Sequence, residues 1–232
     1  MVRSSVRPTE VWHPPAEAPA LPWAAVEASL RAANRLSSPH KLSPWAPTSQ
    51  RRAAVAVVLW GDAQGARRVI LAQRGHGAPH HAGELAFPGG MAEPGDRDLR
   101  ATARRELHEE LGLSAGLSEL GCFPDGVAKG RTRFTPVFFR WEAHEPCLRP
   151  GPELECGLML PLGPLLQAPW GTETHVHHDL ALEAPRLELP EAPLWGATAF
   201  VLRAWLDLLV ECLPGYGTLL PCASSAATSS TS

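Results

Sequence analysis

The stretch FPGGMAEPGDRDLRATARRELHEELGL, residues 87–113, decides how the chain is interpreted. Its second half predicts a helix over Asp98–Leu111, with Asp98 as the N-cap and Gly112 as the residue that ends the last turn. The apolar side chains of this helix recur at every fourth position: Leu99, Ala103, Leu107 and Leu111. That spacing forms one apolar stripe, so one side of the helix is expected to pack on the rest of the domain.

Three glutamates, Glu106, Glu109 and Glu110, occupy neighbouring positions on the surface of this helix. Like charges at that spacing cost roughly a few tenths of a kcal/mol per pair, and the last turn of a helix disfavours negative charge. An ion pair between Arg105 and Glu109 would relieve part of the repulsion, although in the weaker orientation for such a pair. A divalent cation would make the cluster favourable, because Mg²⁺ takes carboxylate, water and phosphate oxygens as ligands.

The segment before the helix supports a cation site. Pro88-Gly89-Gly90 is predicted to be a tight turn after a short strand, in which glycine permits close approach of another group. Glu93 and Asp96 follow, and this acidic loop can fold back onto the glutamates. A strand, a Gly-Gly turn, an acidic loop and an R-E-L-x-E-E-x-G-L helix are together far more specific than any one of them.

This combination resembles the Nudix box, G-x5-E-x7-R-E-U-x-E-E-x-G-U, where U is a bulky aliphatic residue. The second half matches in full, from Arg105 to Leu113. In the first half, counted from Gly90, Asp96 stands where the box has glutamate, and eight residues rather than seven separate it from Arg105.

The expansion by one residue resembles the coenzyme A diphosphatase branch of the Nudix family, which has FPGG-K-x-D-x-x-D-x-D before the helix. The run ILAQRGHGAPHHAGELAFPGG, residues 70–90, aligns without a gap with the upstream signature of that branch, L-L-T-x-R-S-x3-R-x3-G-x3-F-P-G-G. LWGATA, residues 194–199, is similar to its WG-x-TA segment. Met91, Pro79 and Cys156 depart from the branch, because they replace a lysine, an arginine and a glutamate.

The resemblance implies an enzyme that hydrolyses the diphosphate linkage of a nucleoside diphosphate derivative with Mg²⁺ or Mn²⁺. Coenzyme A or its thioesters are the first candidate substrates, with 3′,5′-ADP and 4′-phosphopantetheine as products. Glu106, Glu109 and Glu110 would hold the metal, with help from Asp96. Arg105 would orient a glutamate through a charge-assisted hydrogen bond.

Other residues receive roles from the same resemblance. Glu153, Glu155 and Glu110 are alternatives for the general base. Arg74 would contact a phosphate or, equally, pair with a nearby acid, and the backbone of Gly89 and Gly90 would let the diphosphate approach.

Two other functions stay open. One is a Nudix hydrolase of another substrate, such as ADP-ribose, NADH, a dinucleotide or an oxidised nucleotide. The other is a non-catalytic nucleotide-binding sensor, against which the intact glutamate trio argues. Members of the family often form homodimers, so a homodimer is also open.

The remaining elements predict a mixed α/β sandwich with the sheet between helices, which the resemblance makes a Nudix-type α/β/α sandwich with a mixed β-sheet. The predicted strands are Ala53–Trp60 and Arg68–Arg74, forming a hairpin, then Glu84–Phe87, Leu117–Phe123, Phe134–Trp141, Glu155–Leu160 and Val176–Leu182. The other predicted helices are Trp23–Leu36, a turn at Pro164–Gln167, and Ala197–Leu213. HVHHD, residues 175–179, is interpreted as part of a polar edge strand rather than as a transition-metal site.

These elements divide the chain into a Pro-rich extension with one helix (1–50), a Nudix domain (51–213) and a Ser/Ala/Thr-rich tail expected to be disordered (214–232). The formal charge of −3 is spread without a basic stripe, so nucleic acid is not an expected partner. Five cysteines without a C-x-x-C pair fit a reducing cytoplasm. No segment resembles a secretory signal or a membrane span.

Overall fold

The computed structural model describes residues 11, 21–35, 51–62, 65–76, 82–128, 132–142, 147–177 and 180–213. The predicted tail, most of the Pro-rich extension and Pro79 lie outside the described residues. The division into three segments therefore stays a prediction.

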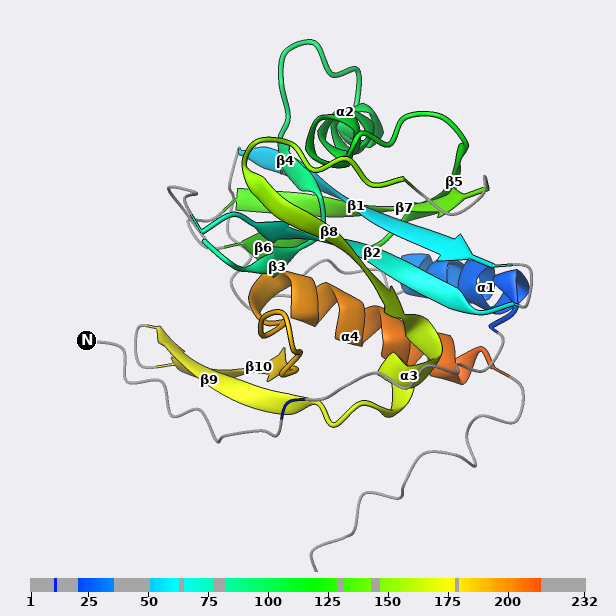
Figure 1. The fold of residues 1–232 in the computed structure, drawn as a ribbon. Helices are drawn as coiled ribbons and strands as arrows, with labels where there is room; N and C mark the ends of the chain where they lie inside the picture. Colours follow the sequence, from blue (N-terminus) through cyan, green and yellow to red (C-terminus); the bar gives the residue numbers. More distant parts are fainter. Residues whose placement is uncertain are drawn as a thin grey trace, which may run out of the picture.

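The described residues form one large mixed sheet and a separate two-stranded sheet (Figure 1). The strands of the large sheet are β1 (Arg52–Gly61), β2 (Arg67–Arg74), β3 (Leu85–Ala86), β4 (Gly89–Met91), β5 (Leu117–Cys122), β6 (Gly126–Ala128), β7 (Thr132–Trp141) and β8 (Leu154–Pro161). The central strand β1 runs antiparallel to β2 and β4 and parallel to β7. The predicted hairpin of the first two strands is confirmed.

Helices cover both faces of this sheet (Figure 1). They are α1 (Trp23–Arg35), α2 (Leu99–Leu111), α3 (Leu162–Gln167) and α4 (Gly196–Glu211). Helix α2 lies on one side of the large sheet, and α1 and α4 lie on the other. The predicted α/β/α sandwich with a mixed sheet is confirmed, together with the N-terminal helix.

Strand β1 is buried on both faces, and its side chains alternate between two apolar clusters. Val57 and Leu59 belong to the cluster under α4, whereas Ala54 and Ala56 belong to the cluster under α2. The small alanines leave room for the leucine stripe of α2 to pack closely on the strand. Helix α2 therefore lies close to the centre of the sheet.

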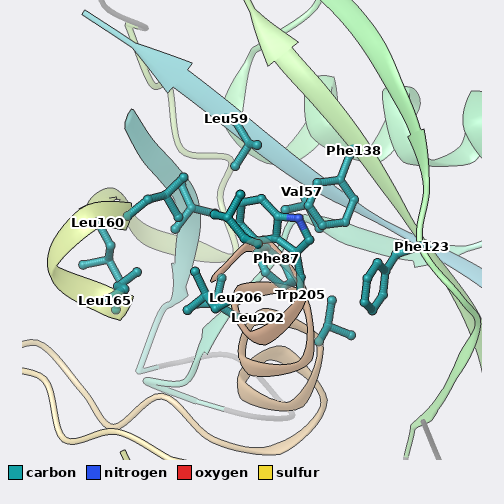
Figure 2. Close-up of a cluster of buried hydrophobic side chains, with 14 of the residues drawn as sticks. Val57, Leu59, Phe87, Phe123, Phe138, Leu160, Leu165, Leu202, Trp205 and Leu206 are labelled. Carbon is teal, nitrogen blue, oxygen red and sulfur yellow. The ribbon is translucent and has the colours of Figure 1, made fainter. Parts of the chain in front are cut away.

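The larger cluster joins the first and last helices of the described chain. Figure 2 shows Trp205 of α4 among Phe138, Val57 and Leu202, and the indole of Trp205 is fully buried. Its Nε1 donates a hydrogen bond of 2.9 Å to the hydroxyl of Ser29 in α1. A buried indole N–H needs such a partner, so this bond fastens α1 to the core.

A second contact fastens the start of α1. The ring of Trp23 lies 4.6 Å from the guanidinium carbon of Arg67 and 4.6 Å from that of Arg140. Such cation–π contacts add to the apolar packing of the helix. Although α1 belongs to the predicted extension, it shares its core with residues 51–213.

Two predictions are wrong. The segment Gly89-Gly90 is not a turn but part of β4, which pairs with Ala54 and Val55 of β1. The glycines are required by the neighbours: a Cβ at Gly89 would collide with the carbonyl of Ala54. A long-range strand pairing thus decides a structure that local signals indicate as a turn.

The single predicted strand Val176–Leu182 is also wrong. The chain forms two antiparallel strands there, β9 (Gly171–His177) and β10 (Leu180–Arg186), in which His177 pairs with Leu180. Sequence periodicity did not reveal this reversal because the polar run HVHHD carries no glycine or proline to mark a turn. The three-residue strand β6 was not predicted at all.

Candidate active site

Local sequence signals place α2 as expected. The Oδ1 atom of Asp98 accepts a hydrogen bond of 2.8 Å from the backbone N–H of Ala101, which caps the first turn. Gly112 adopts a left-handed conformation, with φ of 70°, and ends the helix. These two caps fix the length of the helix and hence the positions of its glutamates.

Arg105 connects the helix to the acidic loop. Its Nη1 atom donates to Glu106 Oε1 and to Glu109 Oε2, each at 2.9 Å. Its Nη2 atom donates to the carbonyl oxygen of Met91 at 2.9 Å and to Asp96 Oδ2 at 3.1 Å. Arg105 thus makes the expected charge-assisted hydrogen bonds to glutamates, and its bond to Glu109 is the predicted ion pair within the helix.

Asp96 is held by this arginine and by its own loop. Besides Arg105, it accepts hydrogen bonds from the hydroxyl of Thr102 at 2.9 Å and from the backbone N–H of Glu93 at 3.0 Å. The hydrogen bonds from Arg105, above all, lower the pKa of Asp96 to about 2. Both carboxylate oxygens of Asp96 therefore already accept hydrogen bonds from the protein. Its role as a metal ligand stays a prediction.

Glu110 and Glu106 lie against the glycine strand β4. Glu110 Oε2 accepts a hydrogen bond of 3.1 Å from the backbone N–H of Gly89, and a Cβ at Gly90 would collide with the carboxylate of Glu106. Burial raises the pKa of Glu110 to about 7. The negative charge of Glu106 also raises this pKa, whereas the hydrogen bond from the Gly89 N–H lowers it. Burial also raises the pKa of Glu106. Negative charge on Glu110 is therefore poorly stabilised, whereas the hydrogen bond from Arg105 offsets part of the cost of burying Glu106.

The loop before β8 brings Glu153 to the same end of α2. The backbone N–H of Gly151 donates to the carbonyl oxygen of Glu110, and that of Gly75 donates to the carbonyl oxygen of Glu153, each at 2.8 Å. The Glu153 side chain is 67% exposed and pairs with Arg74, at 2.9 Å between Oε2 and Nη2. Of the two alternatives predicted for Arg74, the structure contains the pair with a nearby acid. Spacing did not reveal this approach because the residues are 79 positions apart.

The remaining sequence candidates lie outside this group. Glu155 is exposed and is the extra residue of a β-bulge between β2 and β8. His175 and His177 are in β9, but their side chains are outside the described part of the chain. The transition-metal alternative for that stretch is therefore untested.

The donor set fits a hard divalent cation. Among the described residues, no three side chains of His, Cys, Asp or Glu converge closely enough to enclose a metal ion. Mg²⁺ does not need such a cage, because it is usually held by one or two carboxylates together with water and substrate phosphate. Glu106 and Glu110 offer carboxylate oxygens, and their raised pKa values indicate that a nearby positive charge would stabilise their ionised forms. Both properties agree with a cation that takes some of its ligands from the protein.

An apolar cleft of about 160 Å³ adjoins the site on the other side of β4. It is bounded by strands β1, β4, β6 and β7 and by the first turn of α4. Its walls include Phe87, Phe134, Gly89, Gly90, Thr132 and Thr198. Sequence reasoning missed this cleft because its walls come from strands far apart in the chain; the resemblance of residues 194–199 to a WG-x-TA segment was the one available signal.

The family model of the NUDIX domain matches residues 50–170. Nudix hydrolase 22 of Arabidopsis thaliana, described as chloroplastic, is 31% identical over 164 residues, which cover 66% of this chain and 53% of that protein. A probable nudix hydrolase of Schizosaccharomyces pombe is 30% identical over 180 residues, which cover 71% and 59%. The chain thus spans less than two thirds of the length of these relatives.

Solved structures with a similar fold include a Nudix hydrolase from M. Smegmatis, RenU, with 18% identity, a TM-score of 0.48 and coverage of 70% of this chain and 87% of that one. A C. elegans Ap4A hydrolase complex has 20% identity and a TM-score of 0.41, with coverage of 50% and 84%. Among the described residues, none of the helices has the length and apolar character of a membrane-spanning segment.

Proposed function

Because the chain belongs to the Nudix family, we propose that it hydrolyses the diphosphate linkage of a nucleoside diphosphate derivative. The observation that carries the proposal is the contact between two partly buried glutamates of α2, Glu106 and Glu110, and the backbone of β4. Glycine at both positions leaves the strand backbone accessible to a large anion, and the carboxylates supply hard oxygen ligands beside it.

We assign the metal to Glu106, Glu109 and Glu110, with Mg²⁺ or Mn²⁺ as the ion, since Nudix hydrolases generally use divalent cations. When bound, such an ion neutralises phosphate charge and lowers the pKa of a water molecule. Arg105 orients the carboxylates of Glu106 and Glu109. The two hydrogen bonds of Arg105 leave one oxygen of each of these glutamates available for coordination.

The general base in this proposal is Glu153. Its carboxylate is exposed, and its backbone is fixed beside the C-terminal end of α2. Arg74, its partner, carries the positive charge that a substrate phosphate would meet at this position. Glu110, whose pKa lies near neutrality, is the alternative base.

Coenzyme A is the first substrate in the proposal, because the spacing of residues 70–90 and the expanded acidic loop resemble those of the coenzyme A diphosphatase branch. The products would be 3′,5′-ADP and 4′-phosphopantetheine. Met91 and Cys156 replace a lysine and a glutamate of that branch. The test therefore includes other diphosphates as substrates. A cytoplasmic location and a homodimer also stay predictions.

The test is product release with Mg²⁺ from coenzyme A, acetyl-coenzyme A, NADH, ADP-ribose and nucleoside triphosphates, with product masses measured. Coenzyme A cleaved well ahead of the others is the expected result. A preference for another diphosphate would keep the hydrolase and contradict the coenzyme A assignment. Binding of these nucleotides without turnover would instead favour the sensor.

A control variant separates metal-site chemistry from general effects of losing a charge. Glu109→Gln removes a proposed metal ligand, whereas Glu27→Gln removes a glutamate from an exposed ion pair on α1. Only Glu109→Gln should abolish turnover. If both variants kept full turnover, Glu109 would not be a metal ligand.

A further inference from the structure

The apolar cleft beside β4 is not used by the assignments above. None of the described residues that line it carries a charge, and its hydroxyl groups come from Thr132 and Thr198. Burying a charged group in such surroundings without a partner is costly. The cleft therefore suits an uncharged organic group rather than a phosphate.

The same backbone forms a wall of the cleft and touches the carboxylates. Gly89 and Gly90 line the cleft, while Gly89 donates to Glu110 and Gly90 lies against Glu106. A group in the cleft is thus separated from the carboxylates by one strand. It lies within reach of a diphosphate held at that strand.

One pair of residues on neighbouring strands sets the position of a side chain in the cleft wall. Gly126 of β6 pairs directly with Phe134 of β7, and a Cβ at position 126 would overlap the phenyl ring. The ring therefore lies over the glycine, an arrangement in which an aromatic side chain covers a glycine on the adjacent strand. The φ angle of Gly126 lies outside the left-handed range, so the ring, and not the backbone, excludes a side chain there.

Displacing this ring would fill the cleft. Phe134 is 6% exposed and forms part of the cleft wall, and protein interiors are otherwise close-packed. A methyl group on residue 126 would displace the ring from its place over the glycine, and the cleft is open space that the ring borders.

We propose that Gly126 positions Phe134 so that the cleft admits the uncharged arm of the substrate, which makes this pair a determinant of specificity. The inference rests on the proposed diphosphate hydrolysis. For coenzyme A, the arm is pantetheine, whose amides and hydroxyl match the two threonine hydroxyls and whose geminal methyl groups match the apolar walls. The 3′-phosphorylated ribose carries charge and would lie outside the cleft.

The test compares Gly126→Ala, Phe134→Leu and the double variant by Mg²⁺-dependent kinetics with coenzyme A. Gly126→Ala should raise KM roughly 10-fold or more, the effect of about one methyl group in an apolar pocket, and leave kcat within about twofold. The double variant should restore KM, because the added methyl then occupies the space that the smaller leucine leaves, and the wall of the cleft is rebuilt. A merely structural role of Gly126 would lower the melting temperature or kcat without this rescue.

Binding of the two products, measured by calorimetry without metal, identifies the occupant independently of turnover. Gly126→Ala and Phe134→Leu should each weaken 4′-phosphopantetheine and leave 3′,5′-ADP unchanged. The inference would be overturned if the variants bound only 3′,5′-ADP more weakly, or bound both products more weakly to the same extent. Failure of the wild type to bind 4′-phosphopantetheine would also overturn it. Phe134→Leu carries this test if Gly126→Ala does not fold.

The two proposals fail differently. Absence of turnover with every substrate would contradict the proposed hydrolysis, while the product titrations would still test the cleft. Turnover of coenzyme A with an unchanged KM in Gly126→Ala would contradict the cleft assignment alone.

Discussion

The glutamates of α2 lie in two opposite electrostatic surroundings. On one side, Arg105 supplies a fixed cation to Glu106, Glu109 and Asp96. On the other side, Glu110 is partly buried, and its carboxylate accepts a hydrogen bond from the backbone N–H of Gly89. The protein itself thus supplies a cation to Asp96, Glu106 and Glu109, whereas Glu110 gains most from a cation supplied from solution.

The largest expected effect comes from breaking the link between the two regions. Glu106 contacts both Arg105 and β4. Glu106→Gln should lower kcat by more than the roughly 10²–10⁴-fold that general acid–base catalysis contributes, because ion placement is lost as well. The measurement is steady-state turnover of the preferred substrate, with Glu27→Gln as the matched control. A loss below about tenfold would show that Glu106 is not a metal ligand.

Removing the guanidinium of Arg105 should destabilise the acidic loop that contains Asp96. Arg105→Met leaves Asp96 and Glu106 without their arginine, and Asp96 is 8% exposed. We expect the free energy of unfolding in urea to fall by about 2–3 kcal/mol, since hydrogen bonds to charged groups are among the strongest. Arg105→Lys should recover part of this, because lysine keeps the charge but not the forked geometry. Unchanged stability in Arg105→Met would contradict the central role of this arginine.

The two regions should respond to pH in opposite directions when metal is removed. The pKa of Glu110 is raised to about 7 in the folded protein, so its stabilising effect is present at acid pH and is lost as pH rises through 7. Glu110→Gln should therefore be more stable than the wild type at pH 8, by roughly 1–3 kcal/mol, and not at pH 4.

Asp96 supplies the opposite case. Its pKa is lowered to about 2, so its contribution is present above the usual pKa of aspartate and is lost as pH falls toward 2. Asp96→Asn should destabilise the protein at pH 7 and have little effect near pH 2. Thermal unfolding in EDTA from pH 2 to pH 8 measures both variants, and parallel pH profiles for the two would contradict the comparison.

Local and long-range parts of the site differed in how well the sequence predicted them. Helix α2 was predicted to within one residue, because its apolar stripe, its aspartate cap and Gly112 are all local signals. Strand β4 was missed because pairing with β1 outweighs the turn preference of two glycines. The proximity of Glu153 to Glu110 depends on how the loop before β8 caps α2, a contact that spacing alone does not encode.

The bond between Trp205 and Ser29 has a consequence for how the protein is made. Its two residues are 176 positions apart, so the side of α1 that packs on α4 cannot be buried until α4 has left the ribosome. Because synthesis proceeds at about 5–20 residues per second, the face of α1 that packs on α4 stays exposed for many seconds on the nascent chain. During that interval, chaperones can bind the exposed apolar side of α1. Packing of α1 on α4 joins residues far apart in the chain, so we expect it to be the slow step of folding.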